Sequence, residues 1–201
     1  MASLTTSYSD YSFSFKLFIS FVVYGYCVSL IIINPASSAP TPPPPSSILL
    51  TSVCRNTTDY NFCFDSLSSS DPRAATATAD PIELAYASFR LAYSKATATK
   101  AYIDDHLLKS SSSSEAASNP LHRCSGFYEE AMEALEAAYG DLDSESYYWL
   151  AELAGVAGKK VADCNKSFIR RKVPTPLSRM IRDLKNLCQI CLVISNLFIT
   201  S

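Results

Sequence analysis

Few residues in this chain have the types and spacing that catalysis requires. The two histidines, His106 and His122, fall on different predicted helices, and no nucleophile elbow, Gly-rich phosphate loop or HExxH pattern accompanies them. The acidic pair Asp104-Asp105 consists of adjacent residues, whose side chains diverge by about 100° on a helix. Such a pair indicates a solvated helix face rather than an acid–base couple. We therefore expect no catalytic residue, no metal site and no cofactor, and a protein that is not an enzyme.

A Cys-x-x-Cys motif at Cys188 and Cys191 has the spacing of some redox and zinc sites. A redox pair requires a helix N-terminus and electropositive surroundings, whereas this motif lies inside a predicted helix among Leu187, Ile190 and Leu192. Two thiolates alone do not complete a structural zinc site. We interpret both cysteines as small apolar core residues, and the sequence leaves their redox state open.

Charge is distributed unevenly over the second half of the chain. Eight acids and no Lys or Arg lie between Glu129 and Glu152, whereas nine Lys or Arg lie between Lys159 and Lys185. One interpretation is mutual neutralisation between neighbouring helices. The other is a basic surface for an acidic cleft or for a polyanion such as de-esterified pectin.

Two glycines near the start of the basic stretch have two interpretations as well. They provide either close packing inside a bundle or a flattened contact surface for a partner. The candidate partner surface consists of Gly155, Gly158, Lys159, Lys160, Arg170, Arg171 and Lys172.

The first 38 residues have the pattern of a secretory signal peptide. Lys16 precedes an apolar run over 17–33, and the small residues Ala36 and Ser38 precede a cleavage position that makes Ala39 the mature start. The alternative is an uncleaved anchor, but the run is shorter than the about 20 apolar residues that spanning requires. We predict a protein secreted to the apoplast or cell wall, with the vacuole as an alternative, that has no membrane contact after cleavage.

Residues 39–47 are rich in Pro and Ser and predict a stiff spacer, which leaves 48–201 as one folded domain. Six cysteines remain after signal cleavage, and an oxidising compartment favours disulfides among them. Asn56 and Asn165 lie in sequons and are candidate glycosylation sites. Net charge is −2, so the composition by itself implies no nucleic-acid partner.

Apolar residues recur at helical spacing through the folded domain, and no alternating strand pattern of useful length is present. Two short helical segments near 48–54 and 59–67 predict a small hairpin that a Cys54–Cys63 bridge would close. The pairs Asp71-Pro72 and Asp80-Pro81 predict helix starts, because Asp accepts free amides and Pro needs no donor.

Three further starts complete the pattern of long helices. We place one at Asn119-Pro120, one at Asp143 or Ser144 after a turn at Gly140 and Asp141, and one near Leu177. If the helices on either side of that turn fold back on each other, Cys124 and Cys164 come side by side. The sequence thus predicts an all-α protein, an antiparallel four-helix bundle preceded by a short N-terminal helical hairpin.

Several of these features together resemble the plant invertase/pectin methylesterase inhibitor family. The matching residues are Cys54-x8-Cys63 followed by Leu67 and Ser-Ser-Asp-Pro-Arg, Cys124-x3-Tyr128-x2-Ala131-x3-Leu135, Trp149-Leu150, Cys164 with Phe168, Pro176-Leu177 and Asn196. The resemblance implies an up-down bundle with bridges Cys54–Cys63 and Cys124–Cys164.

The resemblance also implies a non-catalytic inhibitor that occludes the active-site cleft of a carbohydrate-active enzyme. Some relatives block pectin methylesterases, and others block acid β-fructosidases through a Pro-Lys-Phe segment that this chain lacks. We therefore expect a pectin methylesterase as the partner. The alternatives are an acid invertase inhibitor and a cell-wall pectin-binding or structural protein without inhibition.

Overall fold

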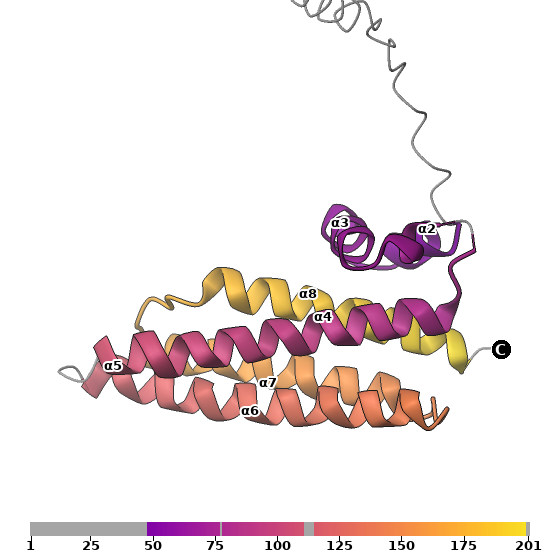
Figure 1. Ribbon diagram of the computed structural model, residues 1–201. Coiled ribbons are helices and arrows are strands. Elements are labelled where there is room, and N and C mark those ends of the chain that lie inside the picture. Colours follow the sequence, from indigo (N-terminus) through magenta and orange to yellow (C-terminus); the bar gives the residue numbers. More distant parts are fainter. Residues whose placement is uncertain (1–47, 77, 111–114, 200–201) are drawn as a thin grey trace, which may run out of the picture. The chain divides into compact units, whose positions relative to one another are not determined.

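The described part of the chain is entirely helical (Figure 1). The computed structural model describes residues 48–76, 78–110 and 115–199, and all of them belong to one compact unit. The predicted signal peptide, the spacer and residues 111–114 of the serine run lie outside the described residues. Within the described ranges no helix combines the length and the apolarity needed to cross a bilayer. The predicted all-α fold class is confirmed.

A short helical hairpin precedes the bundle. Helices α2 (Ile48–Arg55) and α3 (Tyr60–Ser70) are joined by a disulfide between Cys54 and Cys63. Asp59 starts α3, since its carboxylate accepts the Phe62 amide at 3.0 Å and so satisfies one of the free donors of the first turn. The Thr58 hydroxyl donates to the Gln189 side-chain oxygen at 2.6 Å, which fastens the hairpin to the last long helix.

Both predicted Asp-Pro starts form caps. Asp71 accepts the Arg73 amide at 3.0 Å above a short 3₁₀ turn, η1 (Pro72–Ala75). Asp80 accepts the Glu83 amide at 2.8 Å and begins α4 (Pro81–Tyr102). Each proline occupies a position whose missing N–H costs nothing, so the sequence signal and the structure agree.

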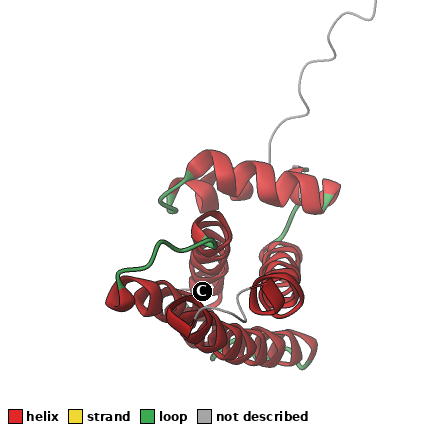
Figure 2. Ribbon diagram, turned by 90° about the vertical axis from the view of Figure 1, so that its left-hand side faces the viewer, coloured by secondary structure: helices red, strands yellow, loops and turns green. Residues whose placement is uncertain are grey.

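Four long helices form a closed ring in cross-section. They are α4, α6 (Glu115–Asp143), α7 (Leu150–Arg171) and α8 (Ser178–Ser195). The extensive contacts run α4–α6, α6–α7, α7–α8 and α8–α4, so consecutive helices are neighbours and the chain runs up and down. Figure 2 shows the bundle end-on, along the helix axes, and the hairpin packs against α4 and α8.

The core lies inside this ring and is lined by residues at helical spacing. Phe89 on α4, Tyr128 on α6 and Phe168 on α7 are its largest buried side chains. Many alanines accompany them, so the helices approach closely. A second disulfide joins Cys124 on α6 to Cys164 on α7 within the core.

A π-helical turn, η2 (Ile103–Leu107), interrupts the end of α4 before the short α5 (Leu108–Ser110). One wide turn re-aims the side chains that follow it. Asp104 therefore faces α6, where its carboxylate accepts a hydrogen bond from the Ser125 hydroxyl at 2.6 Å. The same carboxylate also accepts one from Lys100 of α4 at 2.8 Å. Asp105 instead pairs with Lys109 at 2.9 Å. The two adjacent carboxylates are in separate networks.

The predicted turn at Gly140 and Asp141 is wrong. Helix α6 continues to Asp143 and the chain reverses over 144–149. The Ser144 amide donates to the Gly140 carbonyl at 3.0 Å, and Glu145 then adopts a left-handed conformation with φ 56°. A left-handed residue satisfies the last carbonyls and ends a helix, and here Glu145 does this instead of glycine.

Two other helix boundaries also differ from the prediction. Helix α6 begins at Glu115, so Pro120 lies inside it rather than at its start. Helix α7 begins at Leu150, six or seven residues later than expected from Asp143 or Ser144. Helix α8 is followed by a 3₁₀ turn, η3 (Asn196–Phe198), close to the predicted end.

Candidate functional site

The titratable side chains of the helical core have structural roles. Cys188 and Cys191 are free and buried, and burial raises the pKa of both thiols, that of Cys191 to about 12. A protonated thiol in an apolar environment is a poor nucleophile, so these cysteines act as small core residues. Across the described ranges no group of three or more His, Cys, Asp or Glu residues is arranged to hold a metal ion.

Part of the predicted basic surface is neutralised by neighbouring helices. Lys160 pairs with Glu130 across α6 and α7. On α8, the largely buried Asp183 has Arg182 at 3.2 Å, Arg179 at 3.8 Å and Lys95 of α4 at 3.5 Å. The interpretation of neutralisation between neighbouring helices therefore holds for Lys160, whereas Arg179 and Arg182 are neutralised within their own helix.

Another part of the basic surface surrounds a groove between α6 and α7. The groove has a volume of about 280 Å³ and is lined by Arg123 and Phe127 of α6 and by Lys159, Asp163, Lys166, Ser167 and Arg170 of α7. We call this surface the basic groove. Because α6 and α7 are antiparallel and joined by the Cys124–Cys164 bridge, Arg123 lies next to the C-terminal half of α7.

The only carboxylate among the residues that line this groove is Asp163. Lys166 donates to one of its oxygens at 2.9 Å and Lys159 to the other at 3.1 Å. These two hydrogen bonds hold the pKa of Asp163 below its usual value near 3.8. The carboxylate is therefore ionised at mildly acidic pH, and the groove carries four cationic side chains against one anion.

The other residues of the predicted partner surface are not all exposed together. Gly155 is exposed, whereas Gly158 faces α8, where a Cβ would lie 3.3 Å from Cys188 Cβ. Gly158 therefore has the packing role, and we leave it out of the partner surface. Arg171 and Lys172 are exposed at the end of α7, and Lys172 ends that helix in a left-handed conformation with φ 54°.

Sequence reasoning missed an aromatic surface at the opposite end of α7. Of this segment only Trp149-Leu150 belonged to the expected family pattern, and the reversal over 144–149 leaves Tyr148 71% exposed and Trp149 52% exposed. Their rings meet edge to face at 4.8 Å, and Tyr147 stacks on Phe198 at 4.5 Å, which ties the segment to the C-terminal turn. We call Tyr147, Tyr148 and Trp149 the aromatic tip.

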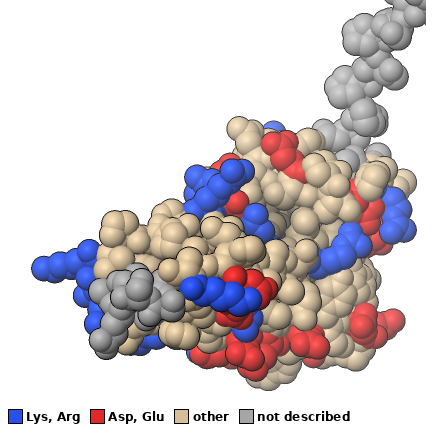
Figure 3. Space-filling model, turned by 60° about the vertical axis from the view of Figure 1, so that its left-hand side comes forward, with Lys and Arg blue, Asp and Glu red and all other residues tan. Residues whose placement is uncertain are grey.

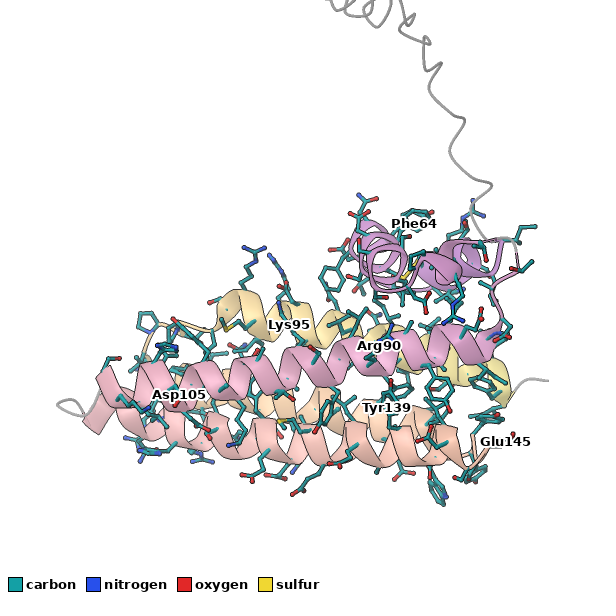
Figure 4. The ribbon with its side chains drawn as sticks, viewed as in Figure 1. Phe64, Arg90, Lys95, Asp105, Tyr139 and Glu145 are labelled. Carbon is teal, nitrogen blue, oxygen red and sulfur yellow. A yellow bond between two sulfur atoms is a disulfide. The ribbon has the colours of Figure 1, made fainter. Side chains whose placement is uncertain are left out.

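The sequence did contain a signal for this surface. Three consecutive aromatic residues on a helix point in three directions about 100° apart, so they cannot all face one core. In Figure 4, the labelled Glu145 marks this reversal at the end of α6 and α7. A run of this kind, beside the acidic end of α6, indicates an exposed contact surface.

A shallow pocket of about 380 Å³ lies between α4 and α6. Arg90, Tyr93 and Glu136 line it together with Tyr139, and Figure 4 shows Arg90 and Tyr139 side by side there. Its neighbouring side chains have structural partners, because the Arg90 guanidinium donates to the Ser70 carbonyl at 3.2 Å and the Tyr139 ring packs on Tyr86 at 5.7 Å. The pocket extends the joint between the hairpin and the bundle.

Residues 48–194, nearly the whole described structure, match the plant invertase/pectin methylesterase inhibitor family. The chain belongs to this family. A pectinesterase inhibitor from Actinidia deliciosa is 30% identical over 169 residues, which cover 84% of this chain and 88% of the relative. The cell wall / vacuolar inhibitor of fructosidase 2 from Arabidopsis thaliana is 29% identical over 145 residues, 71% of this chain and 78% of the relative.

Solved structures show the same fold. A mutant form of a pectin methylesterase inhibitor from Arabidopsis superposes with a TM-score of 0.61 at 24% identity, over 75% of this chain and 97% of that chain. A pectin methylesterase inhibitor from Arabidopsis thaliana gives 0.55 at 23% identity, over 74% and 94%. The predicted family and the predicted bundle with two disulfides are confirmed.

Proposed function

We propose that this protein is a secreted, non-catalytic inhibitor of a pectin methylesterase that covers the active-site cleft of the enzyme. The observation that carries the proposal is the match to an inhibitor family along the whole disulfide-linked bundle. The relative named a pectinesterase inhibitor, over 84% of this chain, favours that target. Two buried bridges also make a rigid surface, and a rigid surface loses less conformational entropy on docking.

The proposed location is the apoplast or cell wall, with the vacuole as the alternative. The signal-like residues 1–38 and two disulfides both fit an oxidising secretory route. Asn56 is exposed on the hairpin, and Asn165 is half-buried on α7 beside the basic groove. Glycosylation at Asn56 therefore has more room than glycosylation at Asn165.

We propose the aromatic tip as the part of the inhibitor that enters the enzyme. Exposed Trp and Tyr side chains are the residue types that most often dominate protein interfaces. Tyr148 and Trp149 are exposed directly before α7, in the segment where the chain reverses between α6 and α7. The acidic residues Asp141, Asp143 and Glu145 precede the tip in the chain, so a basic or neutral cleft rim is the better electrostatic match.

The direct test is a titration of the purified chain starting at Ala39 against pectin methylesterase and acid invertase from the same tissue at mildly acidic pH. We expect stoichiometric one-to-one inhibition of the esterase. Size-exclusion chromatography of the mixture should show a complex of the two proteins. Absence of inhibition of both enzymes at micromolar concentration contradicts the proposed function.

The contribution of the tip is tested with Y148A/W149A. We expect the inhibition constant to rise at least about 30-fold, since a single hot-spot residue contributes about 2 kcal/mol or more. The matched control is I169A, which removes an exposed apolar side chain (65% exposed) from the other end of the same helix. Equal effects of the two changes would show that the tip is not the contact surface.

An acid invertase is the second candidate target. The relative from Arabidopsis thaliana named an inhibitor of fructosidase favours it at 29% identity. The same titration decides between the targets, because it compares both enzymes at equal concentration.

A further inference from the structure

The basic groove contains more cationic side chains than its one carboxylate can neutralise. Asp163 neutralises one charge, and its two partners Lys166 and Lys159 are 2.9 and 3.1 Å away. Arg123 and Arg170 have no ion-pair partner among the side chains that the structure describes, so two guanidinium groups flank the groove with their charge uncompensated. This local excess exists in a chain whose net charge is −2.

The cations of α7 form a line along the helix. Positions 159, 166 and 170 are seven and four residues apart, which corresponds to about 10 Å and about 6 Å along the helix axis. Arg123 faces this line from α6. Figure 3 shows Lys and Arg on several parts of the face, its left end among them, and acidic side chains mainly along the lower edge. A row of separated cations matches a linear polymer with repeated negative charges better than one compact anion.

The groove also has features that suit a carboxylated sugar. A guanidinium group can donate two parallel hydrogen bonds to a carboxylate, which a lysine cannot do. Phe127 is half-buried in the groove wall and offers an apolar face to a sugar ring. Arginine side chains from both helices and an aromatic side chain in the same groove therefore favour an acidic saccharide over an acidic peptide, whose charges are on flexible side chains.

We propose that the basic groove between α6 and α7 binds a linear carboxylated polysaccharide, namely de-esterified galacturonan. The choice of this polymer rests on the proposed function, because a pectin methylesterase converts neutral methyl esters of its substrate into carboxylates. The groove lies at the opposite end of α7 from the aromatic tip, so the polymer and the enzyme occupy different surfaces. The inhibitor then accumulates where its target enzyme has already acted.

Binding of the chain starting at Ala39 to galacturonan oligomers is measured by isothermal titration, with fully methyl-esterified oligomers as the neutral comparison. We expect binding to the acidic oligomers alone and a fall in affinity as salt rises, because counterions compete for the cations. R123A/R170A should lose about tenfold or more in affinity. The control R55A/R179A removes the same charge from exposed positions outside the groove and should change affinity less than about twofold.

Four outcomes overturn the proposal. They are no binding by the wild-type chain, equal binding of the esterified oligomers, equal losses in the two double variants, and a loss of esterase inhibition in R123A/R170A without a change in oligomer binding. The last outcome assigns the groove to enzyme docking. Inhibition by a chain that does not bind galacturonan leaves the proposed function intact, and galacturonan binding by a chain that inhibits neither enzyme contradicts only the proposed function.

Discussion

Separate replacement of Gly155 and Gly158 by alanine tests how tightly α7 packs against α8. Both glycines lie inside α7, so each alanine should gain the intrinsic helix preference of about 1 kcal/mol. A Cβ at Gly155 meets no atom within 4 Å, whereas a Cβ at Gly158 meets Cys188 Cβ at 3.3 Å. That contact is with the first side-chain atom of a buried residue, which cannot swing away.

The expected free energies of unfolding follow from these two contacts. G155A should stabilise the protein by about 1 kcal/mol, because nothing opposes the helix preference. In G158A the overpacking of α7 on α8 costs about 1–3 kcal/mol, so the net change should lie between zero and about 2 kcal/mol of destabilisation.

The two variants can be compared by urea unfolding and by thermal melting. For a domain of this size, 1 kcal/mol corresponds to about 2–4 °C in melting temperature. We therefore expect G155A to melt above the wild type and G158A to melt at or below it. Equal stabilisation by both substitutions would refute the reasoning, since it would mean that α7 and α8 separate freely at Gly158.

Three further predictions concern the bridges, the thiols and one carboxylate. Replacement of both cysteines of the Cys124–Cys164 bridge by alanine should lower the free energy of unfolding by about 3.9 kcal/mol, because that bridge closes a loop of 40 residues. The same replacement at the Cys54–Cys63 bridge should lower it by about 2.6 kcal/mol, because that loop spans 9 residues. The opposite order in urea unfolding contradicts this loop-entropy argument. The two free thiols of α8 should not react with iodoacetamide at pH 8 while the protein is folded, because both are buried. After unfolding, mass spectrometry should find two labels per mature chain. Rapid labelling of the folded chain contradicts their burial. The lowered pKa of Asp163 means that its stabilisation is present above the unfolded value near 4 and is lost as pH falls through the folded value. D163N should therefore be less stable than the wild type at pH 6, and the difference should shrink at pH 2. An equal difference at both pH values contradicts the ion pairs with its lysines.

Local signals in the sequence determined much of the fold. Asp80 followed by proline predicted the start of α4, because a cap depends only on residues within one turn. The helical spacing of apolar residues predicted long amphipathic helices, since amphipathic periodicity is a property of one helix at a time. The burial of Cys188 and Cys191 followed from the apolar residues beside them.

Boundaries that depend on long-range packing were not predictable in the same way. Glycine normally indicates a helix end, but Gly140 remains helical because the packing of α6 on α7 outweighs its weak preference. The chain then reverses at Glu145, a residue with no strong turn signal, and this shift exposes Tyr148 and Trp149.

The sequence by itself determined the helical class, the two Asp-Pro caps, the candidate cysteine pairs and the segregation of acidic and basic residues along the chain. Only the tertiary structure decided which charges are neutralised and which glycine is packed. Lys160 meets Glu130 and Gly158 meets Cys188 because helices distant in sequence lie side by side. Arg123 likewise joins the cations of α7 only through the antiparallel pairing of α6 and α7. Contacts between helices depend on their register and rotation, which no local pattern in one helix specifies.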